Sequence, residues 1–328
     1  MSKYAAITNG VSGLKNINGV FKMHSAPDMD DEGMITIMLS NLEYRTPIKV
    51  QVDFEDLEVV EEGYKAGYSE SEVAEIIRDR FAVFSDMTEA LLDEESGINS
   101  LVVTGATGVG KTYNLEKRLK AAEKEIGQCF DIVGGKATPT GLYMALFRNR
   151  FPGQVLVLDD CNVFDKEDSV DMLKNALDSS EERWVSNLSM SKDLKDQGVP
   201  NKFKFEGKVV FLSNINFMQQ IDRQTKIAPH LAAFVGRSTF IDLMIHDTRS
   251  IMLHVENVVR SSDMFEKMGL SESHMEDAIG FLKENVEELN KLSIRTPLEI
   301  AKLMRLGNNW KRTAQVTQLR PRQIIWAD

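Results

Sequence analysis

The chain has 328 residues, a net charge of −11 and two cysteines. This length allows one large or two ordinary domains, and 42% hydrophobic with 27% charged residues is typical of a globular protein. The acidic balance argues against a broad surface that coats nucleic acid, although it permits a local basic channel. Two cysteines are too few for a disulfide framework, and no apolar segment approaches the roughly 18 residues of a membrane span. We therefore expect a cytoplasmic protein without a membrane partner.

The first 65 residues contain short runs, 34–39 and 47–52, in which apolar and polar residues alternate between glycine-containing turns. Such alternation predicts strands, so we expect a small β-containing segment over residues 1–65. From 69 to 93 the apolar residues recur at helical spacing, which predicts a helix that leads into the next strand.

A strand that ends at Thr104 is followed by the motif G-x-x-x-x-G-K-[ST] and then by a helical pattern. The glycines let backbone N–H groups approach phosphate oxygens, and the helix adds the positive end of its dipole. We expect Lys111 to reach the β- and γ-phosphates of a nucleotide and the Thr112 hydroxyl to hold Mg²⁺. A glycine-rich turn without a ligand is the alternative, which the Gly-Lys-Thr sequence disfavours. The expected nucleotide-binding residues are Gly105, Ala106, Thr107, Gly108, Val109, Gly110, Lys111 and Thr112.

A second strand is expected over 129–133, and a continuous apolar run over 155–158 is typical of a buried parallel strand. That run ends in Asp159 and Asp160. Carboxylates beside a core are costly unless they bind something, so we expect Asp159 to hold Mg²⁺ and Asp160 to polarise the attacking water. Two aspartates that cap a helix are the alternative.

A fourth strand, 209–213, delivers Asn214 to the same edge of the sheet as Asp160. A neutral amide there is suited to orienting water, although asparagine is also a common turn residue. Alternation on both sides of the turn-rich stretch 191–201 predicts a hairpin between Trp184 and Phe205. A short strand over 239–243 follows Arg237.

From about residue 246 the pattern is helical. Ser273 and Thr296 are each followed three residues later by glutamate, which predicts that they cap helices. Arg295 then lies at a helix start, where it faces either a phosphate or solvent. Alternating strands and helices followed by helices alone predict an α/β doubly wound parallel sheet, with three parts: the β-containing segment 1–65, a nucleotide-binding core 66–245, and a helical lid domain 246–328 with a basic C-terminal tail.

The motifs GATGVGKT, VLVLDD and VVFLSN, together with Gly236-Arg237-Ser238 and Leu292-Ser293-Ile294-Arg295, resemble those of the AAA+ ATPases, in particular those encoded by bacteriophages. The resemblance covers about residues 70–310. It implies that Gly105 to Thr112 is Walker A, that Asp159 and Asp160 are Walker B, and that Asn214 is sensor 1. By the same resemblance Arg237 is the arginine finger and Arg295 is sensor 2.

Asp160 departs from the family pattern, since most members have glutamate there. An aspartate pair, an asparagine after a strand and a preceding hairpin are similar to features of the viral superfamily 3 helicases, which generally lack the sensor-2 arginine. AAA+ proteins generally work as rings, often hexamers. In this family Lys136, Lys192 and Lys195 would face the central pore, where they would contact either phosphate or only solvent.

These features together favour a Mg²⁺-dependent ATPase that works as a homo-oligomeric ring motor on single- or double-stranded nucleic acid. We expect it to act as a helicase, translocase or loader in viral replication, together with other replication proteins. One alternative is an ATPase that remodels or loads a protein partner. A small-molecule P-loop kinase and a scaffold that binds ATP without turnover are the others.

Overall fold

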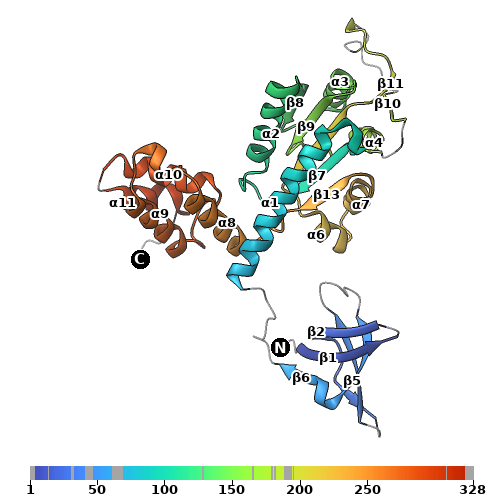
Figure 1. The fold of residues 1–328 in the computed structure, drawn as a ribbon, viewed down its shortest axis with the longest axis vertical. Coiled ribbons are helices and arrows are strands. Elements are labelled where there is room, and N and C mark those ends of the chain that lie inside the picture. Colours follow the sequence, from blue (N-terminus) through green and yellow to red (C-terminus); the bar gives the residue numbers. More distant parts are fainter. Residues whose placement is uncertain are drawn as a thin grey trace, which may run out of the picture. The chain divides into compact units, whose positions relative to one another are not determined.

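The computed structural model describes residues 4–13, 15–30, 33–40, 47–60, 69–127, 129–164, 166–178, 180, 182–187, 194, 196–307 and 309–321. The chain divides into two compact units, Met1–Ser69 and Glu70–Asp328 (Figure 1). No helix in these described ranges is both long and apolar enough to cross a membrane.

The N-terminal unit is a small antiparallel β-structure that closes on itself. Its strands run in the order β2-β1-β5-β4-β3, and an additional pairing of β2 with β4 joins the ends of the four longer strands into a ring. In β4 alternate residues are buried, as the sequence pattern predicts, and they form an apolar interior with Phe21 and Ile17. The elements are β1 (Tyr4–Ser12), β2 (Lys15–Met23), β3 (Asp28–Met29), β4 (Met34–Ser40), β5 (Ile48–Asp53), the 3-10 turn η1 (Phe54–Asp56) and β6 (Leu57–Val60).

The second unit contains a five-stranded sheet, β13-β7-β12-β9-β8, in which every neighbouring pair is parallel. Its strands are β7 (Ser100–Thr104), β8 (Cys129–Gly134), β9 (Gln154–Asp159), β12 (Lys208–Ser213) and β13 (Thr239–Asp242). The sheet confirms the predicted α/β fold class. Because the strands are parallel, β7, β9 and β12 bring the chain to the same carboxyl edge.

Helices cover both faces of this sheet (Figure 1). Successive residues of a strand point to opposite faces, so Leu101 and Val103 pack with α1 and α2, whereas Val102 packs with α3, α4 and α7. Burial on both sides explains why these strands are continuously apolar. The covering helices are α1 (Glu70–Leu92), which follows the predicted range 69–93, η2 (Glu94–Ser96), α2 (Lys111–Ile126), α3 (Pro139–Arg148), α4 (Glu167–Ala176), α6 (Phe217–Asp222) and α7 (Ala228–Arg237).

The predicted hairpin is present as β10 (Trp184–Ser186), which pairs antiparallel with β11 (Lys202–Lys204). Lys192 and Lys195, which were expected at its tip, lie outside the described residues.

Helices alone follow β13, as predicted, and they share an apolar core of their own. They are α8 (Thr248–Ser261), the short η3 (Glu266–Met268), α9 (Glu272–Glu284), α10 (Arg295–Met304) and α11 (Trp310–Gln318). We call α8 to α11 the helical lid.

Both caps predicted in the lid were misplaced. Ser271, rather than Ser273, caps α9, and the Nδ1 atom of His274 accepts a hydrogen bond from the Ser271 backbone N–H at 3.3 Å. Histidine therefore takes the place that the glutamate of a capping box usually has. Helix α10 begins at Arg295, so Thr296 lies inside its first turn, where its hydroxyl bonds to the Lys291 carbonyl at 3.0 Å.

Candidate functional site

The predicted phosphate loop joins the end of β7 to the start of α2 at the carboxyl edge of the sheet. The Gly105 N–H donates to the Ser213 carbonyl of β12, and the Ala106 N–H donates to the Ile245 carbonyl at 2.7 Å. Gly108 and Gly110 adopt φ values of 73° and 96°, which residues other than glycine rarely adopt. The start of the loop is thus anchored to the sheet, and its tight turn depends on its glycines.

Lys111 is drawn into this loop and is only 5% exposed. Its ammonium donates to the carbonyls of Gly105 at 2.6 Å and Ala106 at 2.9 Å, and to the Asn214 side-chain oxygen at 2.6 Å. These acceptors use all three of its N–H groups. Burial lowers the pKa of Lys111 to about 8, although the charges of Asp160 and Asp159 act in the opposite direction.

Asn214 links this lysine to Asp160. Its side-chain amide nitrogen donates to the Asp160 carboxylate, while its oxygen accepts from Lys111. Desolvation raises the pKa of Asp160, against the effects of Lys111 and of the Asn214 amide. Asp160 also has φ = 50°, and its N–H donates to the Leu212 carbonyl of β12 at 3.0 Å. An aspartate in this left-handed conformation is uncommon, and such strain tends to occur at functional sites.

The two residues expected to hold a metal ion also lie together. The Thr112 hydroxyl, on the first turn of α2, donates to the Asp159 carboxylate at the end of β9 over 2.8 Å. Hydroxyl and carboxylate oxygens are ligands that Mg²⁺ prefers, and a bound Mg²⁺ usually keeps several waters. The donor set therefore fits Mg²⁺.

Lid residues that the sequence did not single out contact the phosphate loop. The Ile294 N–H donates to the Gly108 carbonyl at 3.0 Å, and the His254 Nε2 atom lies 2.9 Å from the Val109 carbonyl oxygen. The His254 ring is buried on α8 and stacks on Phe81 of α1 with 4.8 Å between ring centroids. A polar residue on the apolar face of α8 was the only signal in the sequence that could have marked it.

Arg295 directly follows Ile294 and is the first residue of α10. It is exposed, and within the described part of the chain its side chain makes no hydrogen bond or ion pair. Its backbone is thus next to the phosphate loop, while its guanidinium is not engaged.

Arg237 lies elsewhere. It ends α7 and precedes β13, whose first residue Thr239 pairs with Leu101 near the start of β7. Its Nε lies 3.6 Å from the Asp178 carboxylate, and its side chain is 40% exposed. Since β7 runs three more residues before the loop, about 10 Å of strand separates Arg237 from the loop's edge of the sheet.

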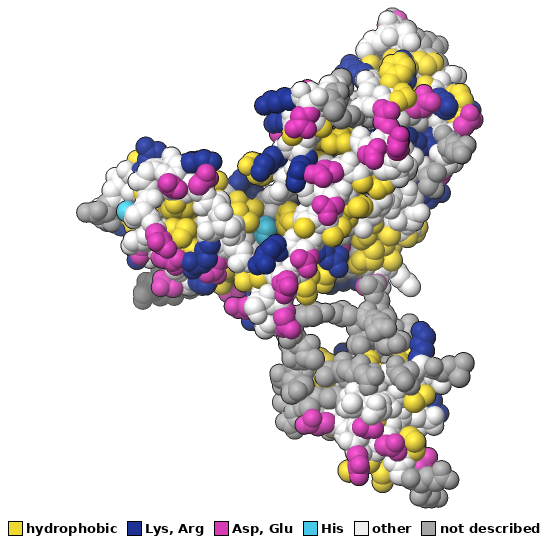
Figure 2. Space-filling view, in the orientation of Figure 1, with side chains coloured by type: hydrophobic (Ala, Val, Ile, Leu, Met, Phe, Trp, Pro, Cys, Tyr) yellow, Lys and Arg dark blue, Asp and Glu magenta, His cyan; other side chains and the backbone are white. Residues whose placement is uncertain are grey.

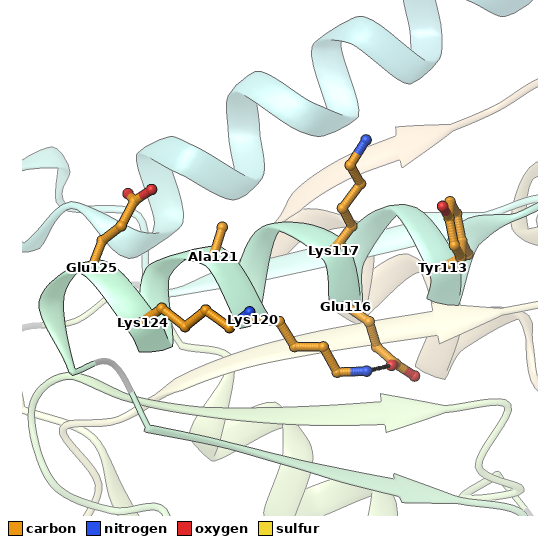
Figure 3. A pocket seen from close by; sticks show the side chains of 7 residues that line it. All are labelled: Tyr113, Glu116, Lys117, Lys120, Ala121, Lys124 and Glu125. Carbon is orange, nitrogen blue, oxygen red and sulfur yellow. Dashed lines mark hydrogen bonds and ion pairs between the residues drawn. The ribbon is translucent and has the colours of Figure 1, made fainter.

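The structure therefore brings together the phosphate loop, Asp159, Asp160 and Asn214, but not Arg237. Lys136 is exposed in the loop between β8 and α3. A shallow depression along the outer side of α2 is separate from this site, since the catalytic candidates do not line it (Figure 3).

Comparison with known proteins places the chain in a family. No model of a known protein family matches it. An uncharacterized 36.7 kDa protein from the nrdC–mobD intergenic region of Enterobacteria phage T4 is 34% identical over 322 residues, which are 95% of this chain and 97% of the phage protein. The chain belongs to the family of this phage protein. The relative and this chain are thus alike along nearly their whole lengths.

Two solved structures match part of this chain. AMPPCP-bound DnaA from Aquifex aeolicus has a TM-score of 0.41 at 15% identity, over 72% of this chain and 64% of that one. NtrX from Brucella abortus in complex with ATP has a TM-score of 0.42 at 14% identity, over 73% of this chain and 50% of that one. The chain spans less than two thirds of either protein, and at this level of overlap its function has to be argued from its own residues.

Proposed function

We propose that this chain is a Mg²⁺-dependent AAA+ ATPase that works as a ring of identical copies on nucleic acid. The observation that carries the proposal is the chain of contacts from Lys111 through Asn214 to Asp160, beside the Thr112–Asp159 pair. A cation, two carboxylates, a hydroxyl and an amide at the end of a phosphate loop are the groups that phosphoryl transfer to water requires.

Each residue has a distinct role in this proposal. The loop amides and Lys111 bind the phosphates, and Thr112 and Asp159 hold Mg²⁺, which neutralises the charge that develops on the phosphate oxygens. Asp160 accepts the proton of the attacking water, for which a raised pKa is suited, and Asn214 orients that water. An aspartate pair of this kind is also similar to that of the superfamily 3 helicases.

The position of Arg237 supports a ring. Its place away from the phosphate loop puts it out of reach of the site in its own copy, whereas an exposed guanidinium can reach a site in a neighbouring copy. An arginine supplied in this way is worth about 10³ to 10⁵ in rate. Arg295, beside the loop, is proposed to contact the phosphates from the lid.

Nucleic acid is proposed as the substrate because exposed Lys136 follows β8 at the carboxyl edge of the sheet. Lys192 and Lys195 are proposed to act with it. The test is the rate of ATP hydrolysis by the full chain with and without single-stranded and duplex DNA. We expect DNA to raise the rate, and Lys136→Ala to reduce this stimulation while leaving the DNA-free rate unchanged. An ATP hydrolysis rate that does not change with DNA would contradict the proposed action on nucleic acid. Absence of any hydrolysis would contradict the proposed ATPase activity.

A protein-remodelling ATPase is the second candidate, favoured by the surface of the N-terminal unit. Phe54 is 69% exposed and lies between Asp53 and Glu55. Figure 2 shows acidic and hydrophobic side chains next to one another on the visible face of this unit. Such a surface suits a basic protein partner. Stimulation of ATP hydrolysis by a protein fraction but not by DNA would favour this candidate.

A further inference from the structure

The end of the helical lid carries a concentration of positive charge that the acidic chain as a whole does not predict. From Ile300 to Pro321 there are five lysines and arginines and no aspartate or glutamate, in a protein of net charge −11. Three of these cations, Arg305, Lys311 and Arg312, lie in or next to the turn that joins α10 to α11, and all three are exposed. We call this group the basic turn.

The cations of the basic turn are not used to hold the lid together. Within the described residues the side chains of Arg305 and Arg312 make no ion pair or hydrogen bond. Lys311 lies 5.5 Å from the ring centroid of Trp310, its neighbour in sequence. By contrast, Arg260 and Lys283 elsewhere in the lid are both paired with Glu256.

The position of two of these cations is electrostatically unfavourable for the helix. Lys311 and Arg312 lie in the first turn of α11, where the helix dipole places positive partial charge and favours acidic side chains. Because no acid lies in that turn, the helix does not gain stability from these residues. A partner with negative charge would relieve both the dipole and the repulsion between the two cations.

Helix α11 packs firmly into the lid, while its outer face is exposed among the described residues. Ala314 is fully buried, and Trp310 packs edge-on against Phe281 at 5.8 Å between ring centroids. At its other end, the Gln318 carbonyl accepts from the Asn290 N–H at 2.8 Å. The helices α9, α10 and α11 thus form one packed group (Figure 1).

The outer face combines the cations with uncharged side chains that suit the edges of base pairs. Val316 is 78% exposed and Gln315 is exposed, and they follow Arg312 by four and three residues, so that they share its side of the helix. Arginine, glutamine and apolar side chains are those that contact guanine, adenine and the thymine methyl group in the major groove. An α-helix with its side chains is about 10–12 Å across, so a helix such as α11 can enter the roughly 12 Å wide major groove.

We propose that the basic turn and the outer face of α11 form a binding surface for duplex DNA. Single strands are a poorer fit because their binding relies on exposed aromatic rings, whereas the one aromatic residue of α11, Trp310, packs into the lid. The surface extends the proposed function because through it the lid binds DNA directly. DNA binding at this surface does not require ATP hydrolysis, so the binding surface and the ATPase activity can be tested separately.

The experiment measures binding of the full chain, without nucleotide, to a fluorescent 30-base-pair duplex and to a 30-nucleotide single strand over a series of salt concentrations. The test variant is the double substitution Lys311→Ala with Arg312→Ala. Its matched control is Lys117→Ala with Lys124→Ala, which removes two exposed lysines from the outer side of α2 (Figure 3). Both variants change the net charge equally.

We expect the wild type to prefer the duplex and the test variant to bind it at least about tenfold more weakly. The slope of log affinity against log salt concentration should fall by about two, or about one per cation, while the control stays near wild type. Val316→Glu, at a site too exposed to disturb the core, should weaken binding as well. Equal losses in test and control variants, preference for the single strand, or no duplex binding at low salt would each overturn the proposal. Binding by Lys111→Ala that equals the wild type would show that the surface acts without the ATP site.

Discussion

Lys111 provides the sharpest prediction about the candidate site, because its charge depends on pH in the range where proteins are usually studied. Burial lowers its pKa from 10.5 to about 8. The shift corresponds to about 3 kcal/mol by which the folded, nucleotide-free chain disfavours the charged lysine. Since the unfolded chain binds the extra proton between pH 8 and 10.5, this cost is fully present below pH 8 and disappears as the pH rises to 10.5.

ATP binding should therefore weaken as the pH rises through 8. A phosphate is attracted by the ammonium form only, and about nine tenths of Lys111 is charged at pH 7 but only about one tenth at pH 9. The affinity should fall about tenfold between these values. ATP itself is not responsible, because a terminal phosphate has a pKa near 6.

Calorimetry of ATP binding between pH 6.5 and 9.5, repeated in buffers with different ionisation enthalpies, measures the affinity and the number of protons taken up for each ATP bound. At pH 9 the protein should take up close to one proton for each ATP bound. Lys111→Arg is the matched control, since its guanidinium does not titrate in this range and its binding, even if weaker, should be independent of pH. An affinity that stays constant to pH 9.5 in the wild type would refute the account of Lys111.

Three further substitutions test other parts of the site. Arg237→Ala should bind ATP normally but no longer hydrolyse it. When the variant is mixed with wild type, the rate of ATP hydrolysis should fall by more than the dilution of wild-type chains explains. A rate equal to the sum of the two proteins' separate rates would argue against a shared site. In Gly108→Ala the new methyl group would lie 2.6 Å from the Ser293 Cβ, so ATP affinity should fall at least about tenfold. Gly127→Ala has a similar φ, and among the described residues nothing lies within 4 Å of its new methyl group, so it should keep its affinity; equal effects of the two substitutions would contradict this explanation. Asn214→Ala should lower the turnover number about a hundredfold with less effect on ATP affinity, as a steady-state assay would show.

The sequence predicted the parallel sheet well because its strands are buried on both faces. Continuous apolar runs at 155–158 and 209–212 leave little choice of structure, and each is followed at once by polar residues that mark the sheet edge. The placing of Asp159, Asp160 and Asn214 together then follows from strand direction alone. Their roles remain predictions.

Contacts between distant segments could not be predicted in the same way. The N-terminal β-structure closes through pairs such as Val11 with Gln51 and Lys22 with Ser40, which depend on register and not on the pattern of any one strand. His254 reaches the phosphate loop across 145 positions of sequence. The shift of the α9 cap to Ser271 had a local cause, namely a histidine in the place of the expected glutamate.

The central claim is that ATP is hydrolysed between copies of this chain, with Arg237 of one copy completing the site of the next. The most direct test measures the rate of hydrolysis per chain and the particle mass on the same samples, over a wide range of protein concentration with saturating ATP and Mg²⁺. If copies share the site, the rate per chain should rise with the fraction of assembled particles and be very low in dilute, monomeric protein. A monomer that hydrolyses ATP as fast as the concentrated protein would contradict the central claim.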